Sequence, residues 1–354
     1  MCIRDRLDEE LKKLKKNAPR PTAVAMSVVE SEDPADGNLH IRGSFDNLGP
    51  VVKRGFVSVC CEDESKPELG AKESGRLQLA QWLANPRHPL TARVYVNRIW
   101  RHLFGTGLVA TTDNFGTVGE RPSHPELLDH IAEEFVNDGW STKRLIRKIM
   151  LSRVYQLSSA NSEFAKSQDP ENRLLWRANR RRVDAEVLRD SILSVSGSLD
   201  LAPGGLTISK ITQYDQNYQF DTVRRSVYVP AFRNSMLDVF EAFDFANPNL
   251  VIGHRNTSTL PTQALFFMNS ELVVKESRKF ANRILERKDL TGEKRIVLAY
   301  RMAIGRQPVS SEIEQALTYI NGFEVDGSER ESELAAWTSF CHALFASLDF
   351  RYVD

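Results

Sequence analysis

Apolar residues recur with the period of an α-helix from residue 76 onward, and this pattern restricts the fold more than any other feature. The clearest case lies between residues 91 and 104. On a wheel of 100° per residue, one face gathers these apolar side chains: Ala92, Val96, Ile99, Trp100 and Leu103. Val94 and Arg101 fall on the opposite face. Thr91 is the expected N-cap and Gly105 the residue that follows the last turn, so the segment is predicted to be a helix with one buried face.

The same period predicts further helices along the rest of the chain. Their expected ranges are 77–83, 123–139, 141–150, 172–196, 262–267, 271–287, 293–303, 311–320 and 331–347. Ser123 and Glu126 have the spacing of a capping box, and Ser141 is an expected N-cap. Residues 225–229 have the composition of a strand. No repeat of 20–50 residues is present, so we expect a globular helical domain and not a solenoid.

The segment that precedes residue 76 has a different composition. Residues 21–62 combine β-branched runs with turn clusters at 33–38 and 46–50, which predicts a small antiparallel unit of two to four strands. The fold class is therefore mainly α, a multi-helix globular domain with a small N-terminal antiparallel β unit. The expected organisation is 1–20 as a scar plus a helix fragment of an upstream region, 21–62 as the β unit, 63–75 as a linker and 76–354 as the helical domain.

The N-terminal segment has no apolar core of the kind found in secretory signals. Leu7, Leu11 and Leu14 form an amphipathic stripe among charged residues, so the chain begins in a predicted helix. We interpret residues 1–6 as a cloning or assembly scar. On this interpretation the missing signal says nothing about the compartment.

The charge balance excludes some classes of protein. The 354 residues contain 47 Lys and Arg against 47 Asp and Glu, which argues against a dedicated nucleic-acid binder or a polybasic membrane module. The longest apolar run is residues 264–268, and a bilayer span needs about 20 residues. A membrane-spanning helix is therefore not expected.

Cysteine spacing argues against several cofactors. The four cysteines are Cys2, Cys60, Cys61 and Cys341, and they form no Cys-x-x-Cys or Cys-x-x-Cys-His motif. Zinc ribbons, thioredoxin chemistry and covalent c-type haem therefore have no support. Two readings of the thiols stay open, a disulfide from Cys341 to one of the adjacent pair, or buried free thiols. No His-x-x-x-His pair occurs, and no metal or other cofactor is expected.

Several long motifs occur in order between residue 75 and the end of the chain. They include RLQLAQWLA at 76–84, NRIWRHLFG at 97–105, NFG at 114–116, PSHPELLD at 122–129, RRSVY at 224–228 and the segment 258–269. In these motifs the sequence resembles the planctomycete cytochrome-c-associated domain of unknown function, the C-terminal domain of large multidomain proteins. His130 departs from the family pattern, which usually has an aromatic residue there, and we expect it at the surface.

The resemblance implies a setting but no catalytic residues. Its members are typically exported and many have a haem c domain upstream, so it implies an extracytoplasmic or periplasmic location in the full-length protein and upstream partner domains. This chain contains neither the haem motif nor an export signal. No nucleic-acid partner is expected.

Three polar concentrations are candidate sites. Arg98 and His102 are four residues apart on the predicted helix 91–104, where they could form an anion pocket or brace the following loop through its carbonyl groups. The loop 105–119 has oxygen donors suited to a cation or a sugar. The segment 253–263, with Arg233 and Asp244, could form a second wall of a cleft or a buried polar network. The candidate cluster, ligand-binding or structural, is Asn97, Arg98, His102, Asp113, Asn114, His124, Arg233, Asp244, His254, Arg255 and Gln263.

One basic run lies outside this cluster. Its residues are Arg177, Arg180, Arg181 and Arg182. Nucleic acid is one interpretation of the run. Because Asp184, Glu186 and Asp190 follow at once, we favour an ion-paired helix start.

Two functions from different classes follow. The first is an extracytoplasmic helical module of a haem-associated multidomain protein that binds a partner domain or ligand. The alternative is a polysaccharide-directed hydrolase or lyase that uses carboxylates and histidines of residues 97–124 and 244–255. Asp113 and Asp244 facing each other in a polar cleft would favour the enzyme. The same two side chains bonded to backbone groups would favour the module.

Overall fold

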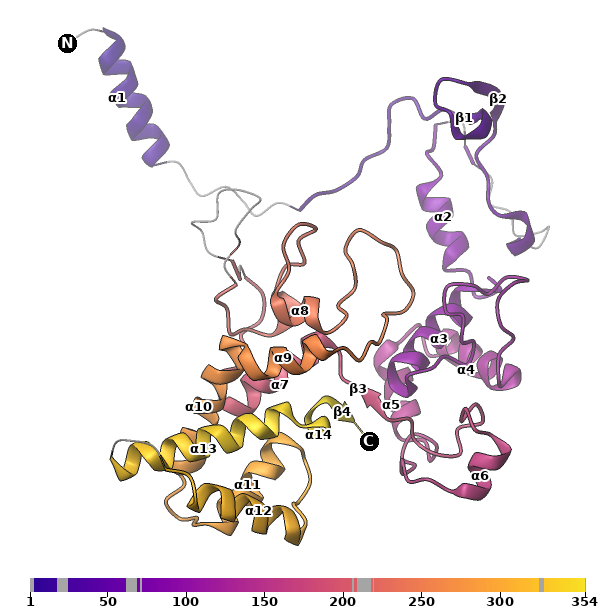
Figure 1. Ribbon diagram of the computed structural model, residues 1–354. Helices are drawn as coiled ribbons and strands as arrows, with labels where there is room; N and C mark the ends of the chain where they lie inside the picture. Colours follow the sequence, from indigo (N-terminus) through magenta and orange to yellow (C-terminus); the bar gives the residue numbers. More distant parts are fainter. Residues whose placement is uncertain are drawn as a thin grey trace. The chain divides into compact units, whose positions relative to one another are not determined.

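The structure is a computed structural model that describes residues 3–17, 25–61, 69–70, 72–205, 207–208, 218, 220–324 and 328–353. It is 49% helical, with 14 α-helices in the described part of the chain and a small two-stranded antiparallel sheet near the N-terminus (Figure 1). This confirms the predicted fold class. The chain divides into two compact units, Met1–Thr91 and Ala92–Asp354.

The first unit contains little regular structure. It comprises α1 (Ile3–Lys16), β1 (Gly37–His40), β2 (Leu48–Val52) and α2 (Arg76–Leu83). β1 and β2 pair antiparallel with Gly37 opposite Val52. Near α2, the Trp82 ring contacts the rings of Phe56 and His88, with centroid separations of 5.4 and 4.5 Å.

The N-terminal β unit has two strands in the described residues, the lower end of the predicted range of two to four. Its two strands confirm the lower bound, but residues 25–29 form no strand. β2 also ends at Val52, and residues 58–60 form a 3₁₀ turn where the composition predicts a strand. The expectations for Met1, Cys2, residues 18–24, residues 62–68 and residue 71 fall outside the described residues.

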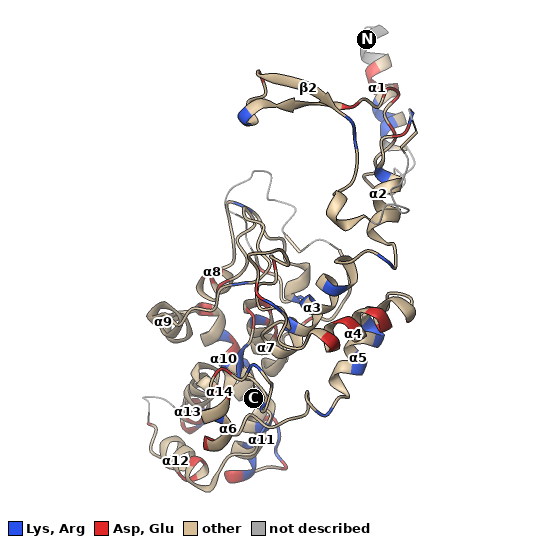
Figure 2. Ribbon diagram, turned by 90° about the vertical axis from the view of Figure 1, so that its right-hand side faces the viewer, with Lys and Arg blue, Asp and Glu red and all other residues tan. Residues whose placement is uncertain are grey.

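The second unit begins with a three-helix core. It contains α3 (Thr91–Phe104), α4 (Pro125–Asn137) and α5 (Thr142–Met150). Their shared core contains Ala92, Val96, Trp100, Phe104, Leu108, Val109, Leu128, Ile131, Ala132, Phe135, Leu145 and Ile149. The face of α3 that the apolar pattern predicts is thus the buried one. The Asp and Glu residues of this pair of helices lie on α4 and the Lys and Arg residues on α5 (Figure 2). Lys148 of α5 pairs with Glu134 of α4 at 2.5 Å.

Some of the helix caps predicted from the sequence are present in the structure and others are not. Gly105 follows α3 with φ +85°, and the Ser141 hydroxyl accepts the backbone N–H of Arg144. α3 starts at Thr91 itself, and the His88 Nδ1 atom lies 3.1 Å from its backbone nitrogen. The predicted capping box is wrong, because α4 begins at Pro125 and the Ser123 N–H donates to the Leu108 carbonyl instead.

A larger core occupies the rest of the second unit (Figure 1). Its helices are α7 (Ala185–Ser196), α8 (Asp238–Ala242), α9 (Pro261–Asn269), α10 (Glu271–Leu285), α11 (Glu293–Ala303), α12 (Ser310–Asn321), α13 (Glu329–Ala346) and α14 (Leu348–Arg351). α10 and α13 pack most extensively against each other. Phe240, Phe267, Phe280 and Phe345 are almost completely buried. The apolar periods of α9–α13 therefore predict these helices to within a few residues.

The segment before α7 contradicts its predicted helix. α7 begins only at Ala185, and a short helix, α6 (Glu163–Gln168), precedes the irregular stretch. Asn172 and Leu175 have positive φ angles, which a helix does not allow. Residues 181–182 form a strand, β3 (Arg181–Arg182), paired antiparallel with β4 (Tyr352–Val353). Because the partner strand lies at the far end of the chain, local periodicity gives no sign of it.

The predicted strand at 225–229 is also wrong. Residues 226–228 form a 3₁₀ turn. The buried Arg189 guanidinium of α7 donates to the carbonyl oxygens of Thr222 and Arg224 and to the Ser226 hydroxyl. These bonds satisfy the backbone groups that strand pairing would otherwise engage.

Cys60, Cys61 and Cys341 carry free thiols, so of the two readings the structure agrees with free thiols. Cys341 is fully buried in the larger core, and this burial raises the pKa of its thiol. No helix in the described residues is long and apolar enough to span a membrane.

Candidate functional site

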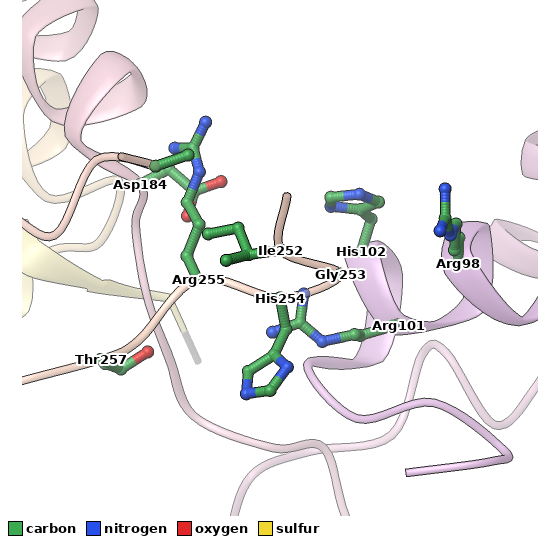
Figure 3. A pocket seen from close by; sticks show the side chains of 10 residues that line it. Arg98, Arg101, His102, Asp184, Ile252, Gly253, His254, Arg255 and Thr257 are labelled. Carbon is green, nitrogen blue, oxygen red and sulfur yellow. The ribbon is translucent and has the colours of Figure 1, made fainter. Parts of the chain in front are cut away.

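The outward face of α3 borders a cavity of about 310 Å³. Arg98, Arg101 and His102 line it from the C-terminal half of the helix, three and four residues apart, and thus on one side. The other lining residues are Asp184, Ala246, Ile252, Gly253, His254, Arg255 and Thr257. We call this the α3 cavity. Figure 3 shows the three α3 side chains projecting from one helix and residues 252–255 running beside it, toward Asp184.

The α3 side chains that line the cavity are not bonded to other side chains or to the backbone of the described residues. Those of Arg98, Arg101 and His102 form no hydrogen bond or ion pair with any described residue. Arg101 is half-buried, and burial lowers the pKa of its guanidinium, partly offset by the carboxylates of Asp184 and Asp113. A cation held away from water without an ion pair is electrostatically unsatisfied, so this place favours an anion.

Arg98 was one candidate to hold the 105–119 loop against α3, but Asn97 does this instead. The Arg98 side chain is exposed and forms no hydrogen bond or ion pair with the described residues. Asn97 is fully buried, its Nδ2 atom donates to the Val109 carbonyl at 3.0 Å, and its Oδ1 atom accepts the Val109 N–H at 2.9 Å. The structural role proposed for Arg98 is therefore wrong, and it belongs to Asn97.

The opposite wall of the cavity belongs to a closed loop, residues 244–258. At its base, Asp244 accepts the Ser258 N–H at 2.8 Å and the Ser258 hydroxyl at 2.8 Å. Arg182 bridges the same two residues, with an ion pair to Asp244 and a hydrogen bond to the Ser258 carbonyl. Gln263 is buried and donates to Ser258 from below. Because its first and last residues are bonded to each other, the segment has the form of an Ω-loop.

The charge of Asp244 is committed to this closure. Burial alone would raise the pKa of its carboxyl group, but hydrogen bonds from Arg182 and Ser258 outweigh it and hold the pKa below the ordinary value of 3.8. Asp244 also has φ +57°, an uncommon backbone conformation for a residue other than glycine. Its geometry is thus that of a structural clamp.

Two further contacts fix the 244–258 loop. The Arg255 guanidinium binds both carboxylate oxygens of Glu186 at 2.6 and 2.7 Å and lies over the Phe245 ring. This pairing raises the pKa of Arg255. The Gly253 N–H donates to the Asp113 Oδ2 atom at 2.7 Å. The side chain between these anchors, His254, is exposed, makes no bond to the described chain and lines the α3 cavity.

The loop 105–119 uses its polar groups internally. The Thr111 hydroxyl donates to the Asn114 carbonyl, and the Asn114 side chain accepts the Gly116 N–H, both at 2.9 Å. A Cβ atom at Gly119 would lie 2.0 Å from the Asn114 carbonyl oxygen, and one at Gly107 would lie 2.5 Å from that of Val109. Two glycines of this loop are thus required for close backbone packing.

The remaining predicted residues lie apart from the cavity. The His124 Nδ1 atom is 3.0 Å from the Ser123 hydroxyl, and Arg233 is exposed. Neither lines the α3 cavity. Within the described residues, no group of three or more His, Cys, Asp and Glu side chains is placed to hold a metal ion.

Sequence reasoning missed Arg101 and Asp184. Arg101 lies opposite the apolar face, so the wheel predicts an ordinary exposed residue. The predicted ion pairing of Asp184 with the preceding arginines is wrong, because Arg182 pairs with Asp244 and Arg181 donates to the His102 carbonyl. No sequence signal marks Asp184 as a cavity residue, because its position directly before an apolar helical run predicts a capping role instead.

A family model, PSD1, described as a protein of unknown function (DUF1553), matches residues 75–320. The chain belongs to the PSD1 family. No curated protein and no solved structure matches it. Every residue that lines the α3 cavity lies within the segment that defines PSD1, whereas α13 and α14 lie beyond it.

Proposed function

We propose that this PSD1 chain is a non-catalytic binding module that holds an anionic group of a ligand or partner domain in the α3 cavity. One observation carries the proposal. The side chains of Arg98, Arg101 and His102 line an open cavity without a hydrogen bond or ion pair, and the Arg101 guanidinium is half-buried there, although a folded protein normally pairs a cation that it takes from water. Arginine presents a planar set of donors that suits carboxylate, phosphate and sulfate groups.

The carboxylates favour binding over the alternative hydrolase or lyase. Glycoside hydrolysis needs two carboxyl groups on either side of the scissile bond, one of them able to give a proton. Asp113 accepts the Gly253 N–H, and Asp244 accepts Ser258 and pairs with Arg182. Both are engaged in holding the 244–258 loop. This is the arrangement expected of a structural module.

We further propose that the module acts outside the cytoplasm, within a longer haem-associated protein. The support is the resemblance of the motifs at 76–84, 97–105 and 122–129, among others, to a domain that typically occurs in exported proteins with an upstream haem c domain. Fractionation of source cells tests this, with immunodetection of the native protein and a haem stain of its band. A cytoplasmic native protein without haem would overturn it.

Anion binding is tested by the thermal stability of the purified chain in rising concentrations of sodium phosphate and sodium acetate. A ligand of the native state raises the melting temperature as its concentration passes the dissociation constant. Phosphate also stabilises proteins without binding them, so the comparison with variants is decisive. We expect Arg101→Gln to lose the saturable part of the shift. Arg147→Gln should keep it, because Arg147 is exposed on α5 and does not line the cavity. Equal curves for all three proteins would reject the proposal.

A further inference from the structure

Asp184 contributes an uncommitted carboxylate to the α3 cavity. It occupies the N-cap position of α7, where an aspartate normally accepts a backbone N–H of the first turn. Here the exposed side chain makes no capping bond, and that side chain forms no hydrogen bond or ion pair with the described residues. Its charge acts on Arg101 and Arg255 only through space. It lines the α3 cavity and also the adjacent cavity of about 610 Å³. Because the Asp184 carboxylate accepts no N–H group of the first turn of α7, its oxygens can accept hydrogen bonds from a ligand.

The α3 cavity thus has two chemically different sides. In Figure 3, Asp184 and Arg255 lie on one side, Arg98 and His102 on the other, and residues 252–253 between them. The α3 side offers positive charge. The Asp184 side offers an anionic acceptor, which binds hydrogen-bond donors.

We propose that the ligand of the α3 cavity is a polyhydroxy carboxylate, that is, a sugar acid of the uronate type. The proposal rests on the anion-binding function proposed above. The carboxylate of the ligand pairs with Arg101 and Arg98, and its hydroxyl groups donate to Asp184. Hydroxyl groups bound to a charged acceptor form strong, directional hydrogen bonds, so Asp184 determines the specificity of the site.

The charge around Asp184 favours hydroxyl groups over an ammonium group. Arg98 and Arg101 line the cavity without an ion pair, whereas Asp184 is its single lining carboxylate among the described residues and the charge of Arg255 is already paired with Glu186. A zwitterion would bring its positive group into this positive surrounding, and like charges repel. A hydroxyl group gains the bond to Asp184 without that repulsion. Ala246 and Ile252 add apolar wall area, which suits the C–H face of a sugar ring.

The test uses the full chain and four probes: sodium D-glucuronate, sodium acetate, D-glucose and β-alanine. Dissociation constants come from calorimetric or thermal-shift titrations at constant ionic strength. We expect glucuronate to bind more tightly than acetate, and glucose and β-alanine to bind more weakly than either. Asp184→Asn should weaken glucuronate by about tenfold relative to acetate, because only glucuronate has hydroxyl groups for the carboxylate, whereas acetate should bind at least as tightly as before once the negative charge near Arg101 is gone.

Asp238→Asn is the matched control, since Asp238 is an exposed first-turn aspartate of α8 without a partner in the described chain. Melting temperatures of both variants verify folding. If acetate binds as tightly as glucuronate, the sugar-acid assignment alone is overturned. The same holds if Asp184→Asn changes the dissociation constant of glucuronate no more than Asp238→Asn does. β-Alanine binding as tight as glucuronate would overturn it too. Failure of every anion, phosphate included, would overturn the anion-binding function itself.

Discussion

The loops 105–119 and 244–258 are both long and polar, yet they use their polar groups in different ways. In the first, Thr111 and Asn114 bond within the loop, and Asn97 joins it to α3. The second is closed at its base by Asp244 and Ser258. It leaves His254 open to the α3 cavity.

The difference shows that polar composition alone does not distinguish a binding loop from a structural one. The relevant quantity is the number of side chains left without a partner once the backbone groups are satisfied. By this criterion the 105–119 loop is a scaffold that contributes one anchoring residue, Asp113, to its neighbour. The 244–258 loop presents the unpaired His254 to the α3 cavity, opposite the unpaired side chains of α3. Four substitutions test this division.

The largest effect is expected at the scaffold. Asn97→Ala leaves the buried N–H and carbonyl of Val109 without partners and creates a small cavity. We expect a loss of about 2–4 kcal/mol in the free energy of unfolding, measured by urea denaturation. Asn137→Ala, at an exposed residue at the end of α4, should change it by less than about 0.5 kcal/mol. A stable Asn97→Ala protein would refute the scaffold role.

The next effect is at the base of the binding loop. Asp244→Asn removes the charge that faces the largely buried Arg182 side chain, so we expect a loss of about 1–3 kcal/mol at pH 7. Asp129→Asn is the control. It removes an exposed ion pair to Arg93, and its effect should be below about 1 kcal/mol.

The loss from Asp244→Asn should depend on pH. Because the pKa of Asp244 is lower in the folded state than its ordinary value of 3.8, its charge stabilises the fold fully above that value. This contribution is lost as the pH falls through the lower, folded-state pKa. The denaturation midpoints of wild type and Asp244→Asn should therefore converge as the pH falls below 3.8. A constant difference down to pH 2 would contradict the ion-pair explanation.

The contact between the two loops should be weaker. Gly253→Ala places a Cβ atom 1.2 Å from the Asp113 Oδ1 position, so the exposed carboxylate must swing away and the bond to the Gly253 N–H breaks. We expect a global loss of about 0.5–1.5 kcal/mol. Amide exchange in residues 246–257 should become faster, as measured by mass spectrometry. Gly55→Ala, where no atom lies within 4 Å of the new Cβ, is the control. Unchanged exchange would show that this contact does not hold the loop.

The sequence predicted the helices well where a helix buries one face. The period of α3 identifies its buried face directly, and the predicted ranges of α10–α13 agree with the structure to within a few residues, because each of these helices packs against a core. The stretch 172–184 could not be predicted. Its conformation depends on β4, near the end of the chain, and on positive φ angles at Asn172 and Leu175.

The candidate site was predicted in part for the same reason. Arg98 and His102 share a flank of the predicted helix 91–104, His254 lies in the polar segment 253–263, and all three line the α3 cavity. Arg101 gained its role only through the 244–258 loop, which is distant from α3 in the sequence. Asp184 looked like a partner of the nearest arginines. The actual partner of Arg182, Asp244, becomes apparent only in three dimensions.

The smallest effect on stability is expected at Arg98, and it separates binding from scaffold most sharply. Because Arg98 is exposed and makes no bond to the described chain, Arg98→Ala should change the free energy of unfolding by less than about 0.5 kcal/mol. Two positions further on, Trp100→Ala removes a buried ring from the opposite face of the same helix and should cost about 3–5 kcal/mol. The phosphate and acetate titrations of Arg98→Ala should nevertheless weaken severalfold, since one of the cavity's unpaired cations is gone. If Arg98→Ala loses stability and keeps its anion affinity, Arg98 has a structural role, and Arg101 and His102 are the α3 residues that bind the anion.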